Sequence, residues 1–352
     1  MPYLLGVHIG ESTVKAAVCR RAAYPPSARD GAGEGWGAAQ PVMLSPAGHT
    51  VAAALKVSTG GHLAPADGSN VVSGQSDEHV AGFVRRVGDD VPLRLGMRRF
   101  SAQSLMAGLV GWVVGRLWQQ ESAAPERIAV VHPTGWGPYR RDLLRAALDE
   151  AGFGALALVP RAGAIVAYYQ AMRHLPVDDR ALIAIHLGGA SLEVSLLAPH
   201  SFGRHELIST TETTSINGDD LQAADTTEQH AIVRAGVAFA LSTAAASGAA
   251  VGAVLLAGGA AGRPLLTDLL TAAFAAPVLS VGDLQAAAAC GAALAVRPRT
   301  DLALPAREPV EAEPMADDYP LVGTAERYSW GTATTARPPR PPVHVTAATV
   351  GR

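Results

Sequence analysis

The chain has 352 residues, of which 49% are hydrophobic and 17% charged, enough for a globular protein with one large core or two smaller ones. The formal net charge of -3 gives no electrostatic reason to expect binding to nucleic acid or to an anionic membrane. Cys19 and Cys290 lie far apart without metal-ligand spacing, and residues 1–10 lack the basic start and long apolar run of a signal peptide. We therefore expect a reduced, cytoplasmic protein.

An internal repeat organises the chain. Residues 4–13 (LLGVHIGEST) match residues 182–191 (LIAIHLGGAS), and each copy has an apolar strand, then His, an aliphatic residue and Gly, then a turn with hydroxyl groups. A second strand is predicted after each copy, over 14–18 and over 192–197. Two such units, each opening one half of the chain, predict a duplicated α/β fold with a cleft between its halves.

Between the two copies, predicted helices and strands alternate, as a mostly parallel sheet with helical cover requires. The spacing of apolar residues predicts helices over 101–119, 139–151 and 162–172, and strands over 127–131 and 156–159. Before them, a stretch rich in Gly, Ala and Pro predicts a loop over about 24–40.

The second half continues with a loop and turn and then alternating elements. The predicted elements are the turn at 216–222, helices over 231–246, 263–274 and 283–296, and strands over 253–257 and 277–280. The uncharged stretch 235–262 is long enough to cross a bilayer, but it consists mostly of small residues, so we interpret it as a buried helix followed by a buried strand. Residues 298–352 are rich in Pro, Ala and Thr and are predicted to be disordered.

Several weak motifs occur in a meaningful order. They are the turns around Gly10 and Gly188-Gly189, the segments 83–89 (FVRRVGD), 128–152, 160–168 and 216–221 (INGDDL), the strand and turn 254–259 with Arg263, and the helix 283–293. In this order they resemble, over about residues 4–296, the nucleotide-binding domain of the DnaK-type heat-shock chaperones, which belong to the actin-like ATPase superfamily. The matching pieces are its two phosphate loops, lysine segment, interlobe helix, adenosine loop and last helix.

The resemblance implies a duplicated actin-like (ribonuclease-H-like) fold with two lobes and a central cleft. The first lobe, residues 1–180, would carry phosphate loop 1, and the second, residues 181–297, phosphate loop 2 and the adenosine loop, followed by the disordered tail 298–352. The stretch between Ser191 and Val254 is too short for the subdomain that helps to grip adenine in the family, so the second lobe is shortened. No β-rich peptide-binding domain follows Val296.

The resemblance also implies a set of nucleotide-binding residues. Glycine turns suit phosphate because backbone N–H groups approach its oxygens without an intervening side chain, although ordinary tight hairpin turns remain the alternative. The residues implied are Gly10, Ser12, Thr13, Gly188, Gly189, Ser191, Gly258, Gly259 and Arg263. The family's arginine of the adenosine loop aligns with Gly262, one residue before Arg263, which leaves adenine binding open.

The catalytic positions of the family are replaced. His8 and His186 stand where the family has the aspartates that hold hydrated Mg²⁺, and imidazole is a poor Mg²⁺ ligand. Val84 stands at the catalytic lysine and Pro160 at the interlobe glutamate. Arg85, Arg86 and Arg161 are adjacent cations, and Glu193 is a surviving acidic residue. Phosphoryl transfer depends on such charges, so we expect that hydrolysis is lost and that Mg²⁺ is not bound.

His8 and His186 are expected to face each other across the cleft. They could bind Zn²⁺, but no Cys or third His stands nearby in the motifs, so we favour two neutral, hydrogen-bonded histidines and predict no metal site. Similarly, Gly218-Asp219-Asp220 is read as a turn with a solvated acidic tip rather than as a metal loop.

The sequence thus predicts a chaperone-like pseudo-ATPase that binds ATP or ADP weakly or not at all and acts through contacts with unknown protein partners. One alternative is an active ATP-dependent enzyme that uses Arg85, Arg86, Arg161 or Ser191 in altered roles. The other is an interaction scaffold whose proline-rich run 337–342 recruits partners.

Overall fold

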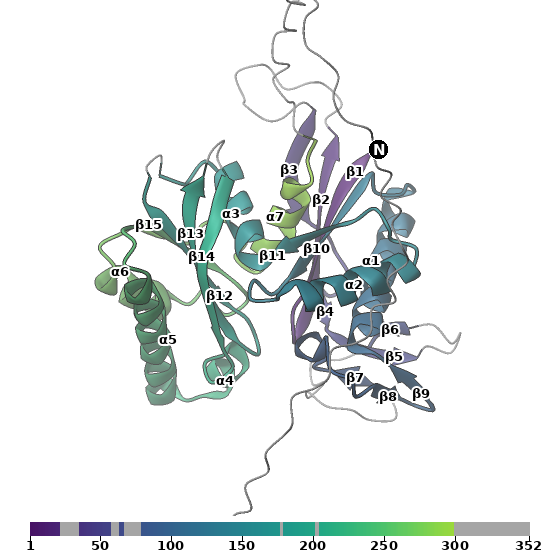
Figure 1. Ribbon diagram of the computed structural model, residues 1–352, viewed down its shortest axis with the longest axis horizontal. Coiled ribbons are helices and arrows are strands. Elements are labelled where there is room, and N and C mark those ends of the chain that lie inside the picture. The colour runs from purple at the N-terminus through teal and green to yellow at the C-terminus, as the bar shows by residue number, and fades with distance from the viewer. Residues whose placement is uncertain (22–34, 58–62, 67–78, 177–178, 201–203, 299–352) are drawn as a thin grey trace, which may run out of the picture. The chain divides into compact units, whose positions relative to one another are not determined.

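A computed structural model of the chain describes residues 1–21, 35–57, 63–66, 79–176, 179–200 and 204–298. Within these ranges the fold is mixed α/β, with several sheets and seven α-helices (Figure 1). Apart from residue 298, the tail predicted over 298–352 lies outside the described residues, as does most of the loop predicted over 24–40.

The first large sheet has the strand order β11-β10-β1-β2-β3, and β4 also pairs with β2. The pairs β1–β2 and β2–β3 are antiparallel, and the pairs β1–β10 and β10–β11 are parallel. The strands are β1 (Tyr3–Ile9), β2 (Thr13–Arg21), β3 (Trp36–Pro41), β4 (Thr50–Ala52), β10 (Arg127–His132) and β11 (Ala157–Pro160).

The second large sheet repeats this arrangement, with the order β14-β13-β12-β15-β16. The pairs β12–β13 and β13–β14 are antiparallel, and the pairs β12–β15 and β15–β16 are parallel. From β3 to β11 and from β14 to β16, the two sheets therefore show the same succession of two antiparallel and two parallel pairs, and the first sheet has the additional antiparallel pair β2–β4. The strands are β12 (Ala181–Leu187), β13 (Leu192–His200), β14 (Arg204–Thr213), β15 (Val251–Ala257) and β16 (Val278–Leu279). The repeat seen in the sequence therefore corresponds to β1–β2 and β12–β13.

Helices and two small sheets complete the described fold. The helices are α1 (Ala102–Glu121), α2 (Pro138–Glu150), α3 (Arg161–Ala171), α4 (Gly218–Ala223), α5 (Thr226–Ser247), α6 (Pro264–Ala273) and α7 (Ala287–Ala295), with a short 3-10 turn η1 (Val84–Arg86). The small sheets, inserted between β4 and α1, are β6-β5-β7 and β8-β9, formed by β5 (Ala54–Val57), β6 (Leu63–Pro65), β7 (Val80–Ala81), β8 (Leu93–Leu95) and β9 (Arg98–Phe100).

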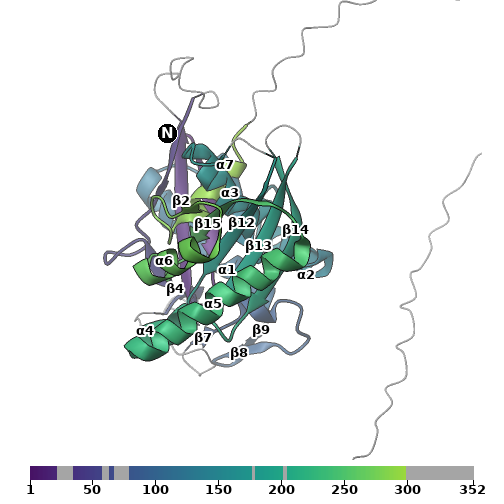
Figure 2. The ribbon, with the colours of Figure 1, turned by 90° about the vertical axis from the view of Figure 1, so that its left-hand side faces the viewer.

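Strand alternation assigns each face of the two large sheets to different helices, because successive side chains of a strand point to opposite faces. Tyr3, Leu5, Val7 and Ile9 of β1 share a core with residues of α1 and α2. The odd-numbered residues of β12 share another core with α5 and α6, which Figure 2 shows lying over the second sheet. The opposite faces, which carry the even-numbered residues, meet α3 and α7.

Helices α3 and α7 pack against each other at a very close crossing. Helix α7 lies on the first sheet, mainly on β1 and β2, whereas α3 contacts β10 and β11 of the first sheet as well as β12 and β15 of the second. A Cβ added to Gly291 of α7 would lie 1.7 Å from the carbonyl oxygen of Ala164, and one added to Gly6 of β1 would lie 2.1 Å from that of Ala289. Only glycine permits these approaches. The last helix of the described chain, α7, thus packs directly on the backbone of the first sheet.

Several sequence predictions were wrong in detail. Strand β14 was missed because its polar side chains hide the apolar alternation of a half-buried strand, and β3 occupies the end of the predicted loop 24–40. The predicted turn 216–222 forms α4 instead. Helix α5 begins five residues earlier than predicted, because Asp225 and Glu228 form a capping box there.

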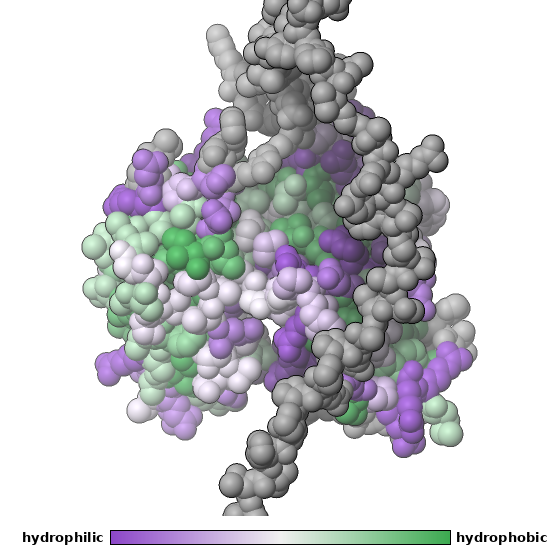
Figure 3. Space-filling model, in the orientation of Figure 1, coloured by the Kyte–Doolittle hydropathy of each residue, from purple (hydrophilic) through white to green (hydrophobic). Residues whose placement is uncertain are grey.

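Among the described residues one helix, α5, is long and apolar enough to cross a membrane, judged by length and composition alone. Core helices of soluble proteins also pass this test. The uncharged stretch 235–262 is divided between α5 and β15, as the sequence predicted. One side of α5 packs on the second sheet through Val233, Val237 and Ala240. The surface over α5, α6 and β14 is mostly apolar or weakly polar in Figure 3.

Candidate functional site

The two repeated histidines lie at equivalent positions, each next to last in the first strand of its sheet and on the face towards α3 and α7. Their rings are 5.4 Å apart in an edge-to-face arrangement, so they face each other as predicted. Both residues are buried, and within the described part of the chain Nδ1 and Nε2 of His8 and Nδ1 of His186 have no hydrogen-bond partner. The expectation that the histidines are hydrogen-bonded was therefore wrong for these nitrogens.

Electrostatics keep both imidazoles neutral. Burial, followed by repulsion from Arg161, lowers the pKa of His8 and the pKa of His186 well below the usual value of 6.5. Lys15 lowers both pKa values further. A protonated imidazole here would add a third buried cation beside Lys15 and Arg161.

Each histidine has a charged cross-strand neighbour, but the charges are opposite. His8 pairs in register with Lys15 of β2, and His186 pairs with Glu193 of β13. The Lys15 ammonium donates a hydrogen bond of 2.6 Å to the hydroxyl of Thr13. Burial, together with repulsion from Arg161, lowers the pKa of Lys15 to about 8, while Asp283 acts in the opposite direction. Lys15 is therefore a buried amine with little compensation.

Glu193 is held by residues of the first half of the chain. Its carboxylate accepts hydrogen bonds from the backbone N–H of Thr134 at 3.0 Å, from the Thr134 hydroxyl at 2.6 Å and from the Arg161 guanidinium at 2.8 Å. The Thr134 hydroxyl also accepts from the N–H of Ala162, in the first turn of α3. Arg161 and Glu193 are both almost fully buried. The surviving acidic residue of the second turn is thus fully engaged.

The two glycine turns contact each other. Each is closed by the same backbone bond, from Gly10 to the carbonyl of Thr13 and from Gly188 to that of Ser191, both at 2.9 Å. The Ser12 hydroxyl donates to Asp219 at 3.1 Å, and a Cβ added to Gly189 would lie 2.4 Å from the Ser12 oxygen. Ser12 therefore fills the space in front of Gly189.

The acidic loop after β14 supports this contact. The N–H groups of Gly218 and Asp219 donate to the carbonyls of Gly188 and Gly189, each at 2.8 Å. The Asn217 side chain caps the start of α4 by accepting from the N–H of Asp220. Residues 218–220 are the first turn of a short helix docked on the second glycine turn, and not a free turn, but Asp219 and Asp220 are exposed, so the prediction of a solvated acidic tip is confirmed.

The remaining positions implied by the resemblance are occupied as follows. Val84 is buried in η1. The two arginines that follow it form ion pairs, Arg85 with Glu11 at 3.5 Å and Arg86 with Asp89 at 3.1 Å. Pro160 is the residue before the first turn of α3. None of these places a free cation or carboxylate beside the histidines in the part of the chain that the structure describes.

The predicted adenosine loop lies beside the second glycine turn. Gly258 has a φ of +107°, and a Cβ there would lie 2.2 Å from the carbonyl oxygen of Leu187, so this position requires glycine. The side chain of Gln285 lies over Gly259. Arg263 precedes the first turn of α6. The structure thus brings Gly258 and Gly259 next to Gly188, while Arg263 begins the following helix.

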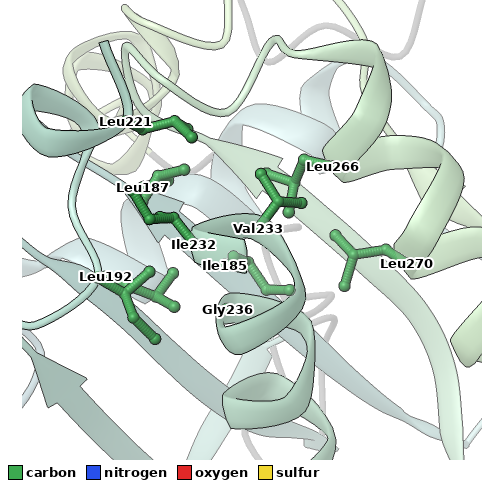
Figure 4. Close-up of a pocket in the computed structure, with 10 residues that line it drawn as sticks. Ile185, Leu187, Leu192, Leu221, Ile232, Val233, Gly236, Leu266 and Leu270 are labelled. Atoms are coloured by element: carbon green, nitrogen blue, oxygen red, sulfur yellow. The ribbon is translucent and has the colours of Figure 1, made fainter. Parts of the chain in front are cut away.

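Two cavities open next to these turns. One of about 340 Å³ is lined by Glu11, Arg85, Pro133, Trp136, Arg140, Arg161, Ala190, Ser191, Glu212, Thr213 and Thr214. Another of about 1160 Å³ is lined by Glu11, Ser12, Thr13 and Asp219 together with mostly small apolar residues around β4–β7. A third, of about 10 Å³, lies in the core between the second sheet, α5 and α6; its wall is entirely apolar (Figure 4), so we regard it as a packing void.

Sequence reasoning missed the roles of Lys15, Thr134 and Arg161. A signal existed for Lys15, since a lysine in an otherwise apolar strand, directly across from His8, is expected to be buried. Nothing in the local sequence links Thr134 and Arg161 to Glu193, because the three residues belong to different elements. Among the described residues, no group of three or more His, Cys, Asp and Glu is placed to hold a metal ion.

No known protein family matches the chain, and no curated protein matches it either.

Proposed function

We propose that the chain is a shortened, degenerate relative of the DnaK-type chaperone ATPase domain, with the duplicated actin-like fold, that does not hydrolyse ATP and acts through contacts with protein partners. The shared strand order and pairing directions of the two large sheets support the fold. The first strand of each sheet ends in the same His-x-Gly turn, and α7 packs on the first sheet, which fits a duplicated unit whose halves are interlocked.

The observation that carries the proposal is the charge at the paired histidines. Mg²⁺ requires oxygen ligands and negative charge. Here two neutral imidazoles face each other, Lys15 and Arg161 add positive charge, and Glu193 already accepts three hydrogen bonds. These residues do not fit a hydrated Mg²⁺ ion, and without it the phosphates of ATP lack their usual counter-charge.

The contact between the glycine turns argues further against tight nucleotide binding. A phosphate between the turns has to displace Ser12 from Gly189 and break its hydrogen bond to Asp219. We therefore propose at most weak binding of ATP or ADP, with no role for Mg²⁺, in a cytoplasmic protein. The same observation favours a second candidate, a scaffold that binds no nucleotide. An active ATPase gains less support, because Arg85, Arg161 and Ser191 are all engaged by carboxylates.

Calorimetric titration with ATP, with and without Mg²⁺, tests the proposal. We expect a Kd weaker than about 10 μM, which corresponds to roughly -7 kcal/mol, and no gain in affinity from Mg²⁺. Mg²⁺-dependent binding below that Kd, or Mg²⁺-dependent release of phosphate from ATP, would overturn it.

A companion variant tests the alignment of the two turns. The double substitution His8→Asp/His186→Asp restores two carboxylates, and we expect Mg²⁺-dependent ATP binding to appear. His230→Asp, on the exposed side of α5, is the matched control and should gain nothing. A folded double variant that gains no such binding would count against the assignment of the two turns as phosphate loops.

A further inference from the structure

We propose that the cavity of about 1160 Å³ between α1 and the strands β4–β7 binds an amphipathic organic acid, with its carboxylate on Arg116 and an aromatic ring against Trp112. The inference is independent of the proposed function, because neither a nucleotide nor a metal ion takes part. It goes beyond that function by assigning a ligand class to side chains that belong to neither glycine turn.

One ridge of α1 runs along the cavity. Residues spaced four apart lie above one another on one side of a helix, and here such a ridge begins at Gly108 and ends at Gln120. A Cβ added to Gly108 would lie 2.8 Å from Cδ1 of Leu63 in β6, and the Gln120 amide donates a hydrogen bond of 2.8 Å to the carbonyl of Met43. Both ends of the ridge are thus in contact with the chain around β4–β7, and Figure 1 shows α1 next to β6.

Between these two contacts the ridge presents Trp112 and Arg116 to the cavity, one turn apart. Both side chains are half-buried. Nε of Arg116 is fully buried, and the guanidinium forms no hydrogen bond or ion pair with any described residue. A buried N–H without an acceptor is costly, and the carboxylate of a bound ligand can satisfy it through the planar fork of the guanidinium.

The wall opposite α1 leaves room for an apolar body. It consists mainly of alanines on and beside β4–β7, namely Ala52, Ala53, Ala54, Ala64, Ala66 and Ala81. Because alanine fills little of the space between strands and a helix, the cavity is large enough for a small organic molecule, whose sites typically measure about 300–1,000 Å³. An aromatic ring bound there can stack on the Trp112 indole.

The charges on the wall favour a single carboxylate over a polyanion. Two carboxylates, Glu11 and Asp219, and two cations, Lys56 and Arg116, line the cavity, so its wall has no net charge. Glu11 forms an ion pair with Arg85, and Asp219 accepts a hydrogen bond from a hydroxyl of the first glycine turn. A neutral wall gives a ligand with several negative charges no overall attraction. One carboxylate on an otherwise apolar body matches the one unpaired guanidinium.

Calorimetric titration of the full chain with cinnamate, and with cinnamyl alcohol as its uncharged analogue, tests the proposal. We expect saturable binding of cinnamate with a Kd of about 0.5 mM or tighter, and binding of the alcohol about tenfold weaker. Acetate, which has the charge without the ring, should not bind measurably in the same concentration range. Equal affinities for cinnamate and either of the other two compounds, or no saturable binding of cinnamate up to about 5 mM, would overturn the proposal.

Two pairs of variants locate the ligand. Arg116→Gln should weaken cinnamate binding about tenfold and leave the affinity for the alcohol unchanged, whereas Arg145→Gln, at an exposed position of α2, should change neither. Trp112→Ala should weaken binding of both compounds to the same extent, whereas Trp118→Ala, at a position of the same helix that is 54% exposed, should affect neither. A folded Arg116→Gln variant that binds cinnamate as tightly as the wild type would overturn the proposal.

Competition with ATP separates this inference from the proposed function. ATP, with or without Mg²⁺, should not displace cinnamate, because the carboxylate and ring sites on α1 lie outside both glycine turns. Displacement of cinnamate by ATP would make the cavity part of a nucleotide site and would overturn the inference. Mg²⁺-dependent ATP binding that leaves cinnamate bound would overturn the pseudo-ATPase proposal alone.

Discussion

His8 and His186 occupy equivalent positions in two sheets of the same strand order, yet their cross-strand neighbours differ in charge. Lys15, beside His8, is buried and forms no ion pair among the described residues. Glu193, beside His186, accepts hydrogen bonds from Thr134 and Arg161. The comparison shows that the same strand-turn-strand unit holds a buried cation without an ion pair, Lys15, in one sheet and a fully hydrogen-bonded carboxylate, Glu193, in the other.

This difference indicates how the two halves are joined. The Glu193 carboxylate of the second sheet forms an ion pair with Arg161 and accepts hydrogen bonds from Thr134, and both partners belong to the first half of the chain. Breaking that ion pair uncovers a buried charge on each side. Moving the two halves apart would break this ion pair and separate two buried charges. The ion pair is therefore suited to holding the two halves together and less suited to a protein that opens and closes repeatedly.

The largest expected effect comes from removing the hydrogen-bonded carboxylate. Glu193→Gln removes the carboxylate that Arg161 binds at 2.8 Å and leaves the buried guanidinium with only the more distant Glu212, at 3.8 Å. We expect the free energy of unfolding to fall by about 3 kcal/mol in urea denaturation. Glu206→Gln, at an exposed position of β14, is the matched control and should change stability by less than about 0.5 kcal/mol.

A double variant separates loss of the charge pair from loss of packing. Arg161→Met/Glu193→Leu replaces both charges by apolar side chains and should recover most of the stability lost in Glu193→Gln. If Glu193→Gln costs less than about 1 kcal/mol, the ion pair does not join the two halves in the way described.

The second prediction compares the two sheets at the residue two places before each histidine. Gly6 of β1 has the backbone of α7 directly above it, whereas the equivalent Ala184 of β12 has room for its methyl group against α3. Gly6→Ala should therefore destabilise the protein by about 3 kcal/mol, at the upper end of the cost of overpacking. Ala184→Gly should cost only about 1 kcal/mol.

Thermal unfolding of the two variants measures this difference directly. Gly115→Ala is a useful control, because its added Cβ meets nothing within 4 Å on α1 and should stabilise the helix slightly. Equal losses in Gly6→Ala and Ala184→Gly would mean that α7 can move away from β1 and that the two sheets are covered alike.

The sequence predicted the parts of this comparison that depend on local patterns. The repeated strand, the histidine and the glycine turn were visible because a buried strand followed by Gly is a contiguous signal, and most helices lie within a few residues of their predicted ranges. The sequence predicted the mixed α/β class correctly. Strand β14 was missed because an edge strand with polar side chains lacks the apolar pattern of a buried strand.

The contacts at the candidate site were less predictable. Arg161 was noted as a neighbour of Pro160 and as a residue that an active ATPase could use, but its pairing with Glu193 depends on where α3 begins relative to Glu193, 32 residues further along the chain. Likewise, the histidines were expected to be hydrogen-bonded, but both are buried, and Nδ1 and Nε2 of His8 and Nδ1 of His186 have no partner among the described residues. Pairings between distant elements follow from packing, which no local pattern contains.

The smallest expected effect concerns the buried cation. Burial lowers the pKa of Lys15 from 10.5 to about 8, and a shift of this size corresponds to roughly 3 kcal/mol of unfavourable free energy in the charged form at neutral pH. Lys15→Met removes that cost but also loses the hydrogen bond to Thr13, worth about 1 kcal/mol. We therefore expect the variant to be more stable at pH 7 by about 2 kcal/mol.

The pH dependence of stability checks the cause. Between pH 8 and 10.5 the unfolded wild type keeps the proton on Lys15 while the folded protein has released it, so wild-type stability should rise with pH in this window. In Lys15→Met that rise should be absent, so the two stability curves should cross, and by pH 10.5 the wild type should be the more stable by about 1 kcal/mol, the value of its hydrogen bond to Thr13. Parallel curves would show that Lys15 is not perturbed in the folded protein, and the contrast between the two sheets would then rest on Glu193 alone.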